Sequence, residues 1–294
     1  TISGMQINVN GYNTVHVGLF SGVTAGAIIE NIVFSDCHID IKTSVQACAG
    51  IVVGTVNEGS YASIRNIAVL NSSVSAVTSN INNYSAIGSI AGAGTKLSIQ
   101  NAYSNAYLSG GCTNEGNTQF AVGGMIGYSW RGLATVSGAV FNGSIDKSAH
   151  AASDINYANG ILALNPNTGT FPTQKSNFTS CYYNSDKLTP SATTNGGHID
   201  GTALNTAQLE NAKLSELGLS GEYWCADAGA LTLDIALPKA VPNYPGYIPL
   251  YDAWDLAKIG VDAAYPLDGS YMMMNDIDMS DYGNWTPIAN TTAS

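Results

Sequence analysis

Two sequence elements recur along the first 184 residues with a period close to 35. A glycine followed by apolar residues marks each unit, and successive glycines are separated by 32, 38, 36 and 36 residues: Gly18, Gly50, Gly88, Gly124 and Gly160. An Ile-x-Asn element follows, in which Asn31, Asn66 and Asn101 lie 35 residues apart, with weaker copies at 136–139 and 175–178. Such repeats are typical of solenoids, because each unit buries its apolar face against the next unit.

Each unit predicts three short strands: one after the glycine, one after the Ile-x-Asn element, and a third such as 37–41 or 73–77. In the first unit we expect one set of alternating residues to face the core and the other set to face outward: Val33, Ser35, Cys37, Ile39 and Ile41 against Phe34, Asp36, His38, Asp40 and Lys42. The predicted fold is all-β, a parallel, right-handed β-helix or β-solenoid of about five to seven turns stacked about 4.8 Å apart.

The equally spaced asparagines predict one corner of this β-helix. Asparagine tolerates a left-handed backbone, and its side-chain amide can bond to the amide of the next turn. Ordinary solvated turn residues are the alternative. The equal spacing of Asn31, Asn66 and Asn101, beside loops of unequal length such as 110–121 and 147–158, favours a ladder.

Charged residues make up only 11% of the chain, and the net charge is −11. A chain of this charge repels phosphate backbones and anionic membrane surfaces, so we expect no nucleic-acid partner. No stretch approaches the roughly 18 consecutive apolar residues of a membrane span. Stacked turns also explain the low charge, because identical side chains on successive turns lie about 4.8 Å apart, where like charges repel.

The sequence divides into three segments at the point where the repeat stops. Residues 1–184 form the predicted β-helix, 185–249 a loop, a short helix and a proline-rich linker, and 250–294 a second short helix and strands. The first helix is predicted over 205–217, with Asn205 as N-cap and Gly218 as the stop. The second is predicted over 252–260, followed by strands near 271–279 and 285–288.

The order of several motifs resembles the GLUG-motif repeat proteins, which are β-helical regions of large bacterial surface adhesins and surface proteases. The segments 255–260, 271–279 and 284–288 are similar to the opening of that repeat, and 1–5 to its next step. Gly18-Leu19-Phe20-Ser21-Gly22 resembles its signature, 29–33 the strand after it, and 181–183 with 206–209 its closing segment. The resemblance implies an extracellular, cell-surface β-helix.

In that family the segment 251–288 would precede Thr1, so the chain resembles a permuted unit or one period of a tandem array. An open first turn at Thr1 needs a partner, because unpaired strand edges promote aggregation. The C-terminal segment either caps the chain's own first turn or pairs with the first turn of a neighbouring copy, which would build a filament.

Parallel β-helices host carbohydrate lyases and hydrolases, so an enzyme is an alternative for this fold. Such hydrolases need clustered carboxylates, whereas the acids here lie mostly singly on different turns. Lyases acting on uronates need cations, and the repeat region has only Arg65 and Arg131 as arginines. Gly196-Gly197-His198 has no paired aspartate at a matching corner. We therefore predict no enzyme and no catalytic or cofactor-binding residues.

Metal binding has equally weak sequence support. The histidines have neither metal-ligand nor triad spacing: His16, His38, His150 and His198. Asp276, Asp278 and Asp281 form the one acidic cluster, and Ca²⁺ uses such oxygen ligands, but the glycine and bidentate glutamate of a calcium loop are missing. We predict no metal site, with calcium at this cluster as the alternative to a solvated strand edge.

The cysteines and glycosylation sequons leave alternatives open. The five cysteines form either disulfides, Cys37 to Cys48 being the shortest, or small buried apolar residues: Cys37, Cys48, Cys112, Cys181 and Cys225. Six Asn-x-Ser/Thr sequons occur, and they are meaningful only if the source glycosylates: Asn71, Asn83, Asn142, Asn177, Asn284 and Asn290.

The function expected from these patterns is structural or adhesive: a stalk, filament subunit or binding module of an extracellular surface protein. Tyr128 and Trp130 either stack on sugars or partner proteins, or pack on their own rod. A carbohydrate-binding or carbohydrate-active β-helix and the non-catalytic part of a surface protease are the alternatives.

Overall fold

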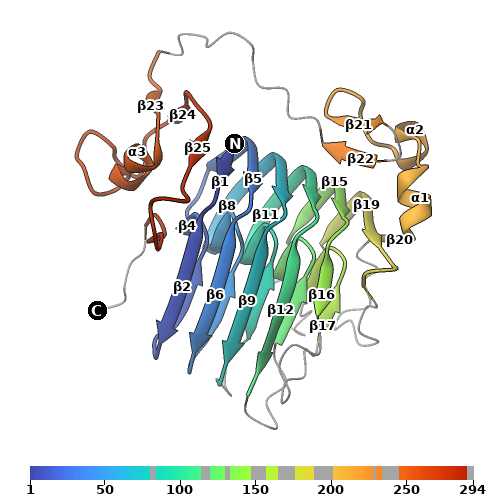
Figure 1. Cartoon of the computed structure of the whole chain (residues 1–294), viewed down its shortest axis with the longest axis horizontal. Helices are drawn as coiled ribbons and strands as arrows, with labels where there is room; N and C mark the ends of the chain where they lie inside the picture. Colours follow the sequence, from blue (N-terminus) through green and yellow to red (C-terminus); the bar gives the residue numbers. More distant parts are fainter. Residues whose placement is uncertain are drawn as a thin grey trace.

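The computed structural model describes residues 1–79, 84–113, 120–129, 133–146, 157–164, 176–188, 201–227, 230–233 and 245–289. These residues form a β-solenoid of about four turns, in which parallel strands stack on three faces (Figure 1). The predicted parallel β-helix is therefore confirmed. The described turns are fewer than the five to seven expected, and residues 147–156 and 165–175 of the fifth unit lie outside the described residues.

Each face of the solenoid is one sheet. The first sheet has the order β20 (Thr202–Leu204), β19 (Asn177–Asn184), β15 (Thr135–Phe141), β11 (Ala91–Ser104), β8 (Val53–Leu70), β5 (Ala27–Ser35), β1 (Ile2–Ser3) and β25 (Ile277–Asp278), with β4 (Phe20–Val23), β14 (Ile126–Ser129) and β18 (Leu162–Leu164) attached. The second sheet has the order β16 (Ser144–Asp146), β12 (Tyr107–Cys112), β9 (Ser73–Thr78), β6 (His38–Thr43) and β2 (Gln6–Gly11). The third has the order β17 (Tyr157–Asn159), β13 (Phe120–Gly123), β10 (Ser85–Gly88), β7 (Ala47–Ala49) and β3 (Val15–Val17).

The corner between the first and second sheets changes the predicted inside and outside faces. Cys37, Ile39 and Ile41 are buried as expected, but Phe34 is also fully buried, at 0% exposure. The expectation that Phe34 faces outward was wrong because Asp36, at φ +52°, turns the chain between β5 and β6 and resets the alternation.

The predicted asparagine ladder is present along the first sheet. Asn66 Nδ2 donates to Asn31 Oδ1 at 2.8 Å, and Asn101 Nδ2 donates to Asn66 Oδ1 at 3.0 Å. All three residues have left-handed backbone, with φ of 60°, 53° and 50° along the chain. The same conformation continues at Gly138 (φ 62°) and Ser180 (φ 52°). The fifth copy was therefore placed wrongly at 175–178, since Asn177 pairs with Thr135 and the corner comes three residues later.

The recurring glycines permit close stacking of successive turns. A Cβ on Gly50 would lie 2.5 Å from the carbonyl oxygen of Ile90 on the next turn, and a Cβ on Gly88 would lie 2.5 Å from that of Met125. Any side chain at these positions would push the turns apart.

Residues 205–227 and 230–233 form a side module against the outer surface of the first sheet, near β19 and β20 in Figure 1. It contains α1 (Thr206–Glu210), α2 (Leu214–Leu217) and the antiparallel pair β21 (Trp224–Asp227) and β22 (Ala230–Leu233). Asn205 caps α1 and Gly218, at φ +63°, ends α2, as predicted. The single predicted helix is divided at Asn211, the C-cap of α1, whose backbone nitrogen and side-chain Nδ2 both donate to the carbonyl oxygen of Ala207.

Residues 245–289, called the cap here, lie beside the first turn (Figure 1). The cap contains β23 (Ile248–Leu250), α3 (Ala253–Lys258), β24 (Tyr271–Met273) and β25. Ile277 and Asp278 pair in parallel with Ile2 and Ser3. Further along, the amide nitrogens of Trp285 and Ile288 donate to the carbonyl oxygens of Gln6 (2.7 Å) and Leu19 (2.9 Å). In this structure the segment therefore caps its own chain.

Helices are short throughout the described residues, and none there is long and apolar enough to cross a membrane.

Candidate functional site

The residues weighed for catalysis or metal binding are scattered. His38 Nδ1 lies 2.9 Å from Ser73 Oγ on the next turn, and burial lowers the pKa of His16. His150, His198 and Arg131 lie outside the described residues. In the segments that the structure describes, no group of three or more His, Cys, Asp or Glu could hold a metal ion.

Within the acidic cluster of the cap, Asp278 makes local hydrogen bonds. The Asp278 carboxylate accepts from the backbone nitrogen and the hydroxyl of Ser280, at 2.9 and 2.7 Å, and these bonds lower the pKa of Asp278.

The cysteines belong to the packing of the solenoid. All five lie in described segments and none is in a disulfide there, and Cys225 alone is not buried. Burial raises the pKa of Cys37 to about 11 and that of Cys48 to about 12, so both remain neutral thiols. The small-apolar interpretation is confirmed for the four buried cysteines and wrong for Cys225, which lies in β21 of the side module, and the Cys37–Cys48 disulfide was wrong.

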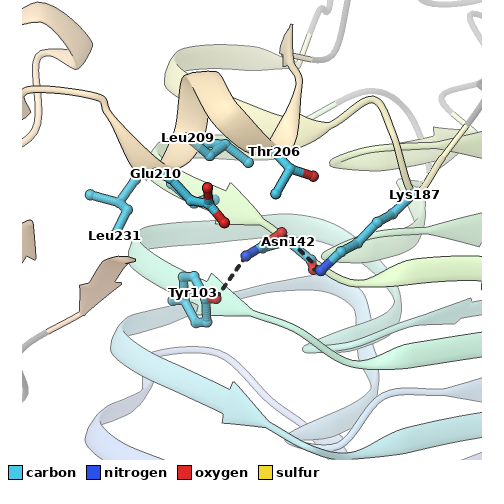
Figure 2. Close-up of a pocket in the computed structure, with 8 residues that line it drawn as sticks. Tyr103, Asn142, Lys187, Thr206, Leu209, Glu210 and Leu231 are labelled. Atoms are coloured by element: carbon cyan, nitrogen blue, oxygen red, sulfur yellow. Dashed lines mark hydrogen bonds between the residues drawn. The ribbon is translucent and has the colours of Figure 1, made fainter. Parts of the chain in front are cut away.

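A small cavity of about 160 Å³ lies where the side module meets the first sheet (Figure 2). Its apolar wall belongs to the cluster that fastens the side module to the solenoid. Its polar groups come from two sheet corners and from α1. The lining residues are Tyr103, Val140, Asn142, Lys187, Thr206, Leu209, Glu210 and Leu231.

Asn142 lies at the centre of the polar side of this cavity. It follows β15 and stacks on the asparagine of the next turn: Asn184 Nδ2 donates to Asn142 Oδ1 at 2.8 Å. Asn142 Nδ2 in turn donates to the hydroxyl of Tyr103 at 3.2 Å. The amide is therefore held in one orientation by a donor on one side and an acceptor on the other.

Lys187 reaches the same asparagine from the turn after β19. Its Nζ donates to the backbone oxygen of Asn142 at 2.9 Å and to Oδ1 of Asn142 at 3.2 Å. The turn that carries Lys187 is ordered by two contacts: the backbone nitrogen of Asp186 donates to Asn184 Oδ1, and Asp186 Oδ2 accepts from the backbone nitrogen of Thr206. The lysine is thus positioned by the first turn of α1.

Glu210 and Tyr103 complete the polar set. Figure 2 shows the Glu210 carboxylate pointing toward the Asn142 side chain, with Lys187 on the other side of that residue. Burial raises the pKa of Tyr103, so its hydroxyl stays protonated. Lys187, Asn142 and Glu210 thus all line this small cavity, and Lys187 and Glu210 are exposed to solvent.

This constellation was not predicted from the sequence. Asn142 was noticed only as a sequon, and Lys187 and Glu210 belong to no motif. The three residues are separated by 45 and 23 positions, so only the stacking of β15 on β19 and the docking of α1 bring them together.

Exposed aromatic side chains lie on the cap, whereas the aromatic residue of β14 is buried. Tyr128 is only 5% exposed and stacks on Tyr84 with ring centroids 5.2 Å apart, so it packs on its own rod, and Trp130 lies outside the described residues. On the cap, Trp254 is 66% exposed, and its ring lies 4.9 Å from that of Tyr282.

Comparison with known proteins gives no relative: no family model, no curated protein and no solved structure matches the chain. The similarity to GLUG-motif proteins therefore remains an expectation from the sequence motifs. The β-solenoid itself follows from the strand pairing.

Proposed function

We propose that the chain is a structural and adhesive module of an extracellular surface protein, serving as a stalk or as a self-associating filament subunit. The observation that supports this most is the uninterrupted stacking of the first sheet from β25 to β20. A solenoid whose turns all pair with their neighbours resists bending and proteolysis, because local opening must break several parallel ladders together.

The side-chain ladder adds to this stiffness. Asn31, Asn66 and Asn101 connect successive turns outside the backbone ladder, and Glu30 pairs with Arg65 across the same two turns. Such contacts are expected to stiffen a rod rather than to bind a substrate, because the polar side chains at the surface bond to one another.

Head-to-tail association would use the cap. The backbone groups of β1 that bond to β25 can bond equally to the β25 of a second copy, which would extend the solenoid from chain to chain. Residues 234–244, which join the side module to the cap, lie outside the described residues.

A disulfide trap tests this association. Ser3 and Asp278 are register partners, so a double variant Ser3→Cys and Asp278→Cys places two thiols on neighbouring strands at a separation that suits a disulfide. Exchange of caps between chains yields a ladder of covalent oligomers on non-reducing gels, and each single variant serves as control. A purely intramolecular bond at all protein concentrations would contradict filament formation through this edge.

Carbohydrate binding is a second candidate, favoured by the exposed aromatic surface of the cap. Tyr251, just before α3, is 51% exposed, and Trp254, in the first turn of α3, is 66% exposed and lies next to Tyr282. Flat aromatic rings can stack on sugar faces. A glycan array on which the wild-type chain binds and Trp254→Ala does not would support this function, with Tyr12→Ala, remote on β2–β3, as the matched control. Equal signals from both variants and wild type would contradict it.

A further inference from the structure

We infer that the cap carries a docking surface for a basic polypeptide segment, in which an arginine side chain of the partner stacks on the Trp254 ring. This surface goes beyond the proposed mechanical role and does not depend on it. It includes the aromatic side chains considered above for sugars but takes a positively charged protein ligand. Two properties of the cap point to such a partner: its exposed apolar side chains and its negative charge.

Exposed apolar side chains gather on the cap. Among the described residues, nine large apolar side chains are exposed, and four of them lie on the solenoid. The other five belong to the much smaller cap: Tyr247, Tyr251, Trp254, Val261 and Leu267. Scattered single apolar side chains are normal at a surface, whereas a gathering of them on one small module marks an interaction site.

The Trp254 ring is held in place by neighbouring aromatic side chains. Its centroid lies 4.9 Å from that of Tyr282, and the Tyr282 ring in turn meets Trp285 edge-on at 5.2 Å. Trp285 is buried, and its indole nitrogen donates to the carbonyl oxygen of Leu19. An exposed ring supported in this way is preorganised for stacking, because little side-chain freedom is lost when a ligand binds.

The cap also carries most of the negative charge of the chain. Seven aspartates against one lysine give residues 245–289 a net charge of −6, more than half of the −11 of the whole chain. The one lysine, Lys258, is engaged within the cap: its Nζ lies 2.8 Å from Asp255 Oδ1 and 5.2 Å from the centre of the Tyr265 ring. The surrounding field therefore attracts a further cation.

Two exposed aspartates are adjacent in sequence to the aromatic residues of this surface. Asp252 follows Tyr251, and Asp281 precedes Tyr282. Within the described residues, the ion pairs of the cap involve neither of these aspartates. Guanidinium is the cation that suits such surroundings best, because it is planar, stacks on aromatic rings and donates two hydrogen bonds to one carboxylate.

A second copy of this chain is a poor source of that cation. Each copy carries the same net charge of −11, and the chain has only two arginines. Arg65 is paired with Glu30, and Arg131 lies outside the described residues. Nucleic acids and anionic membranes are repelled by the same charge. The partner that complements an apolar and acidic surface is therefore a different, basic polypeptide.

Fluorescence anisotropy of the full chain with a labelled peptide of alternating arginine and glycine tests this surface. We expect binding at low salt that weakens toward about 0.5 M NaCl, roughly threefold weaker binding of the matching lysine peptide, and none of the glutamate peptide. Trp254→Leu keeps an apolar side chain but lacks the ring, and should weaken binding about fivefold. Asp281→Asn should weaken it about twofold.

Matched controls lie on the solenoid, away from the cap. Tyr12→Leu removes an exposed ring, and Asp40→Asn removes an exposed carboxylate on β6; neither should change the affinity for the arginine peptide. Thermal melting shows whether each variant is folded, so that loss of binding is read only from folded chains.

Four outcomes would overturn the docking surface. No binding of the arginine peptide by the folded wild-type chain is the first, and equal affinity of wild type and Trp254→Leu is the second, since it leaves charge alone as the cause. Binding of a neutral glycan without binding of the peptide is the third, and it would support the carbohydrate function instead. The fourth is self-association that Trp254→Leu abolishes, without peptide binding, which assigns the surface to a second copy.

Discussion

The side chain of Asn66 donates to that of Asn31 across one turn of the solenoid, at 2.8 Å, and both asparagines have left-handed backbone. One residue type thus meets two requirements of the same corner: a positive φ and a bond to the turn below. The first prediction separates these requirements.

Asn66→Gly removes the ladder bonds but accepts the backbone, whereas Asn66→Ala removes the bonds and strains the backbone. We expect the glycine variant to lower the free energy of unfolding by about 1 kcal/mol and the alanine variant by about 2–3 kcal/mol. Denaturant titration measures both, with Asn10→Ala on the exposed side of β2 as control. Equal losses in the two variants would contradict the role of the left-handed backbone.

Gly50→Ala should destabilise the chain through a steric clash with the next turn. The new Cβ would lie 2.5 Å from the carbonyl oxygen of Ile90, and we expect a loss of about 3 kcal/mol in the free energy of unfolding. Gly11→Ala is the matched control, because a Cβ there meets nothing within 4 Å. Similar stability of the two variants would show that the turns are not in tight contact at Gly50.

Trp285 anchors the cap, so its truncation should release the first turn. The side chain is 2% exposed, and its indole nitrogen donates to the carbonyl oxygen of Leu19 at 3.3 Å. We expect Trp285→Ala to cost about 3–5 kcal/mol and to promote association through the uncovered β1 edge, measured by denaturation and light scattering. Trp254→Ala, at an exposed site, should change neither quantity.

Acid should loosen the cap through Asp255. The Lys258 ammonium at 2.8 Å, and next the backbone N–H of Tyr251 at 3.0 Å, hold the pKa of this carboxyl below its usual range. Because the folded-state pKa is depressed, its stabilising contribution is complete above the unfolded value of about 3.9 and is lost as pH falls through the folded value.

Thermal unfolding between pH 7 and pH 2 checks this dependence. Asp255→Asn should be less stable than wild type at pH 7, and the difference should shrink below about pH 4. A difference that stays constant over this range would assign the effect of the substitution to packing rather than to charge.

Several features of the fold could be predicted because they depend on local backbone requirements. The recurring glycines and asparagines mark corners whose conformation few residues accept, and Asn205, Gly218 and Asp252 mark helix ends by their own hydrogen bonds or φ. Two predictions failed at corners, where a residue of positive φ shifts the alternation of side chains. Asp36 reversed the expected exposure of Phe34, and Ser180 rather than Asn177 forms the fifth corner.

The candidate site could not be predicted, because its members share no pattern along the chain. Asn142 stacks on Asn184 of the next turn. Lys187 lies in the turn after β19, and Glu210 is the last residue of α1. Their meeting depends on the register of β15 with β19 and on how α1 docks.

By itself, the sequence determined that this chain stacks into a parallel β-solenoid, since a 35-residue period with fixed corner residues permits apolar burial only between neighbouring turns. Only the tertiary structure decided that the cap closes the chain's own first turn and that Lys187 lies against Asn142. Both are contacts between distant segments. They depend on side-chain packing and hydrogen bonds that the spacing of residues along the sequence does not predict.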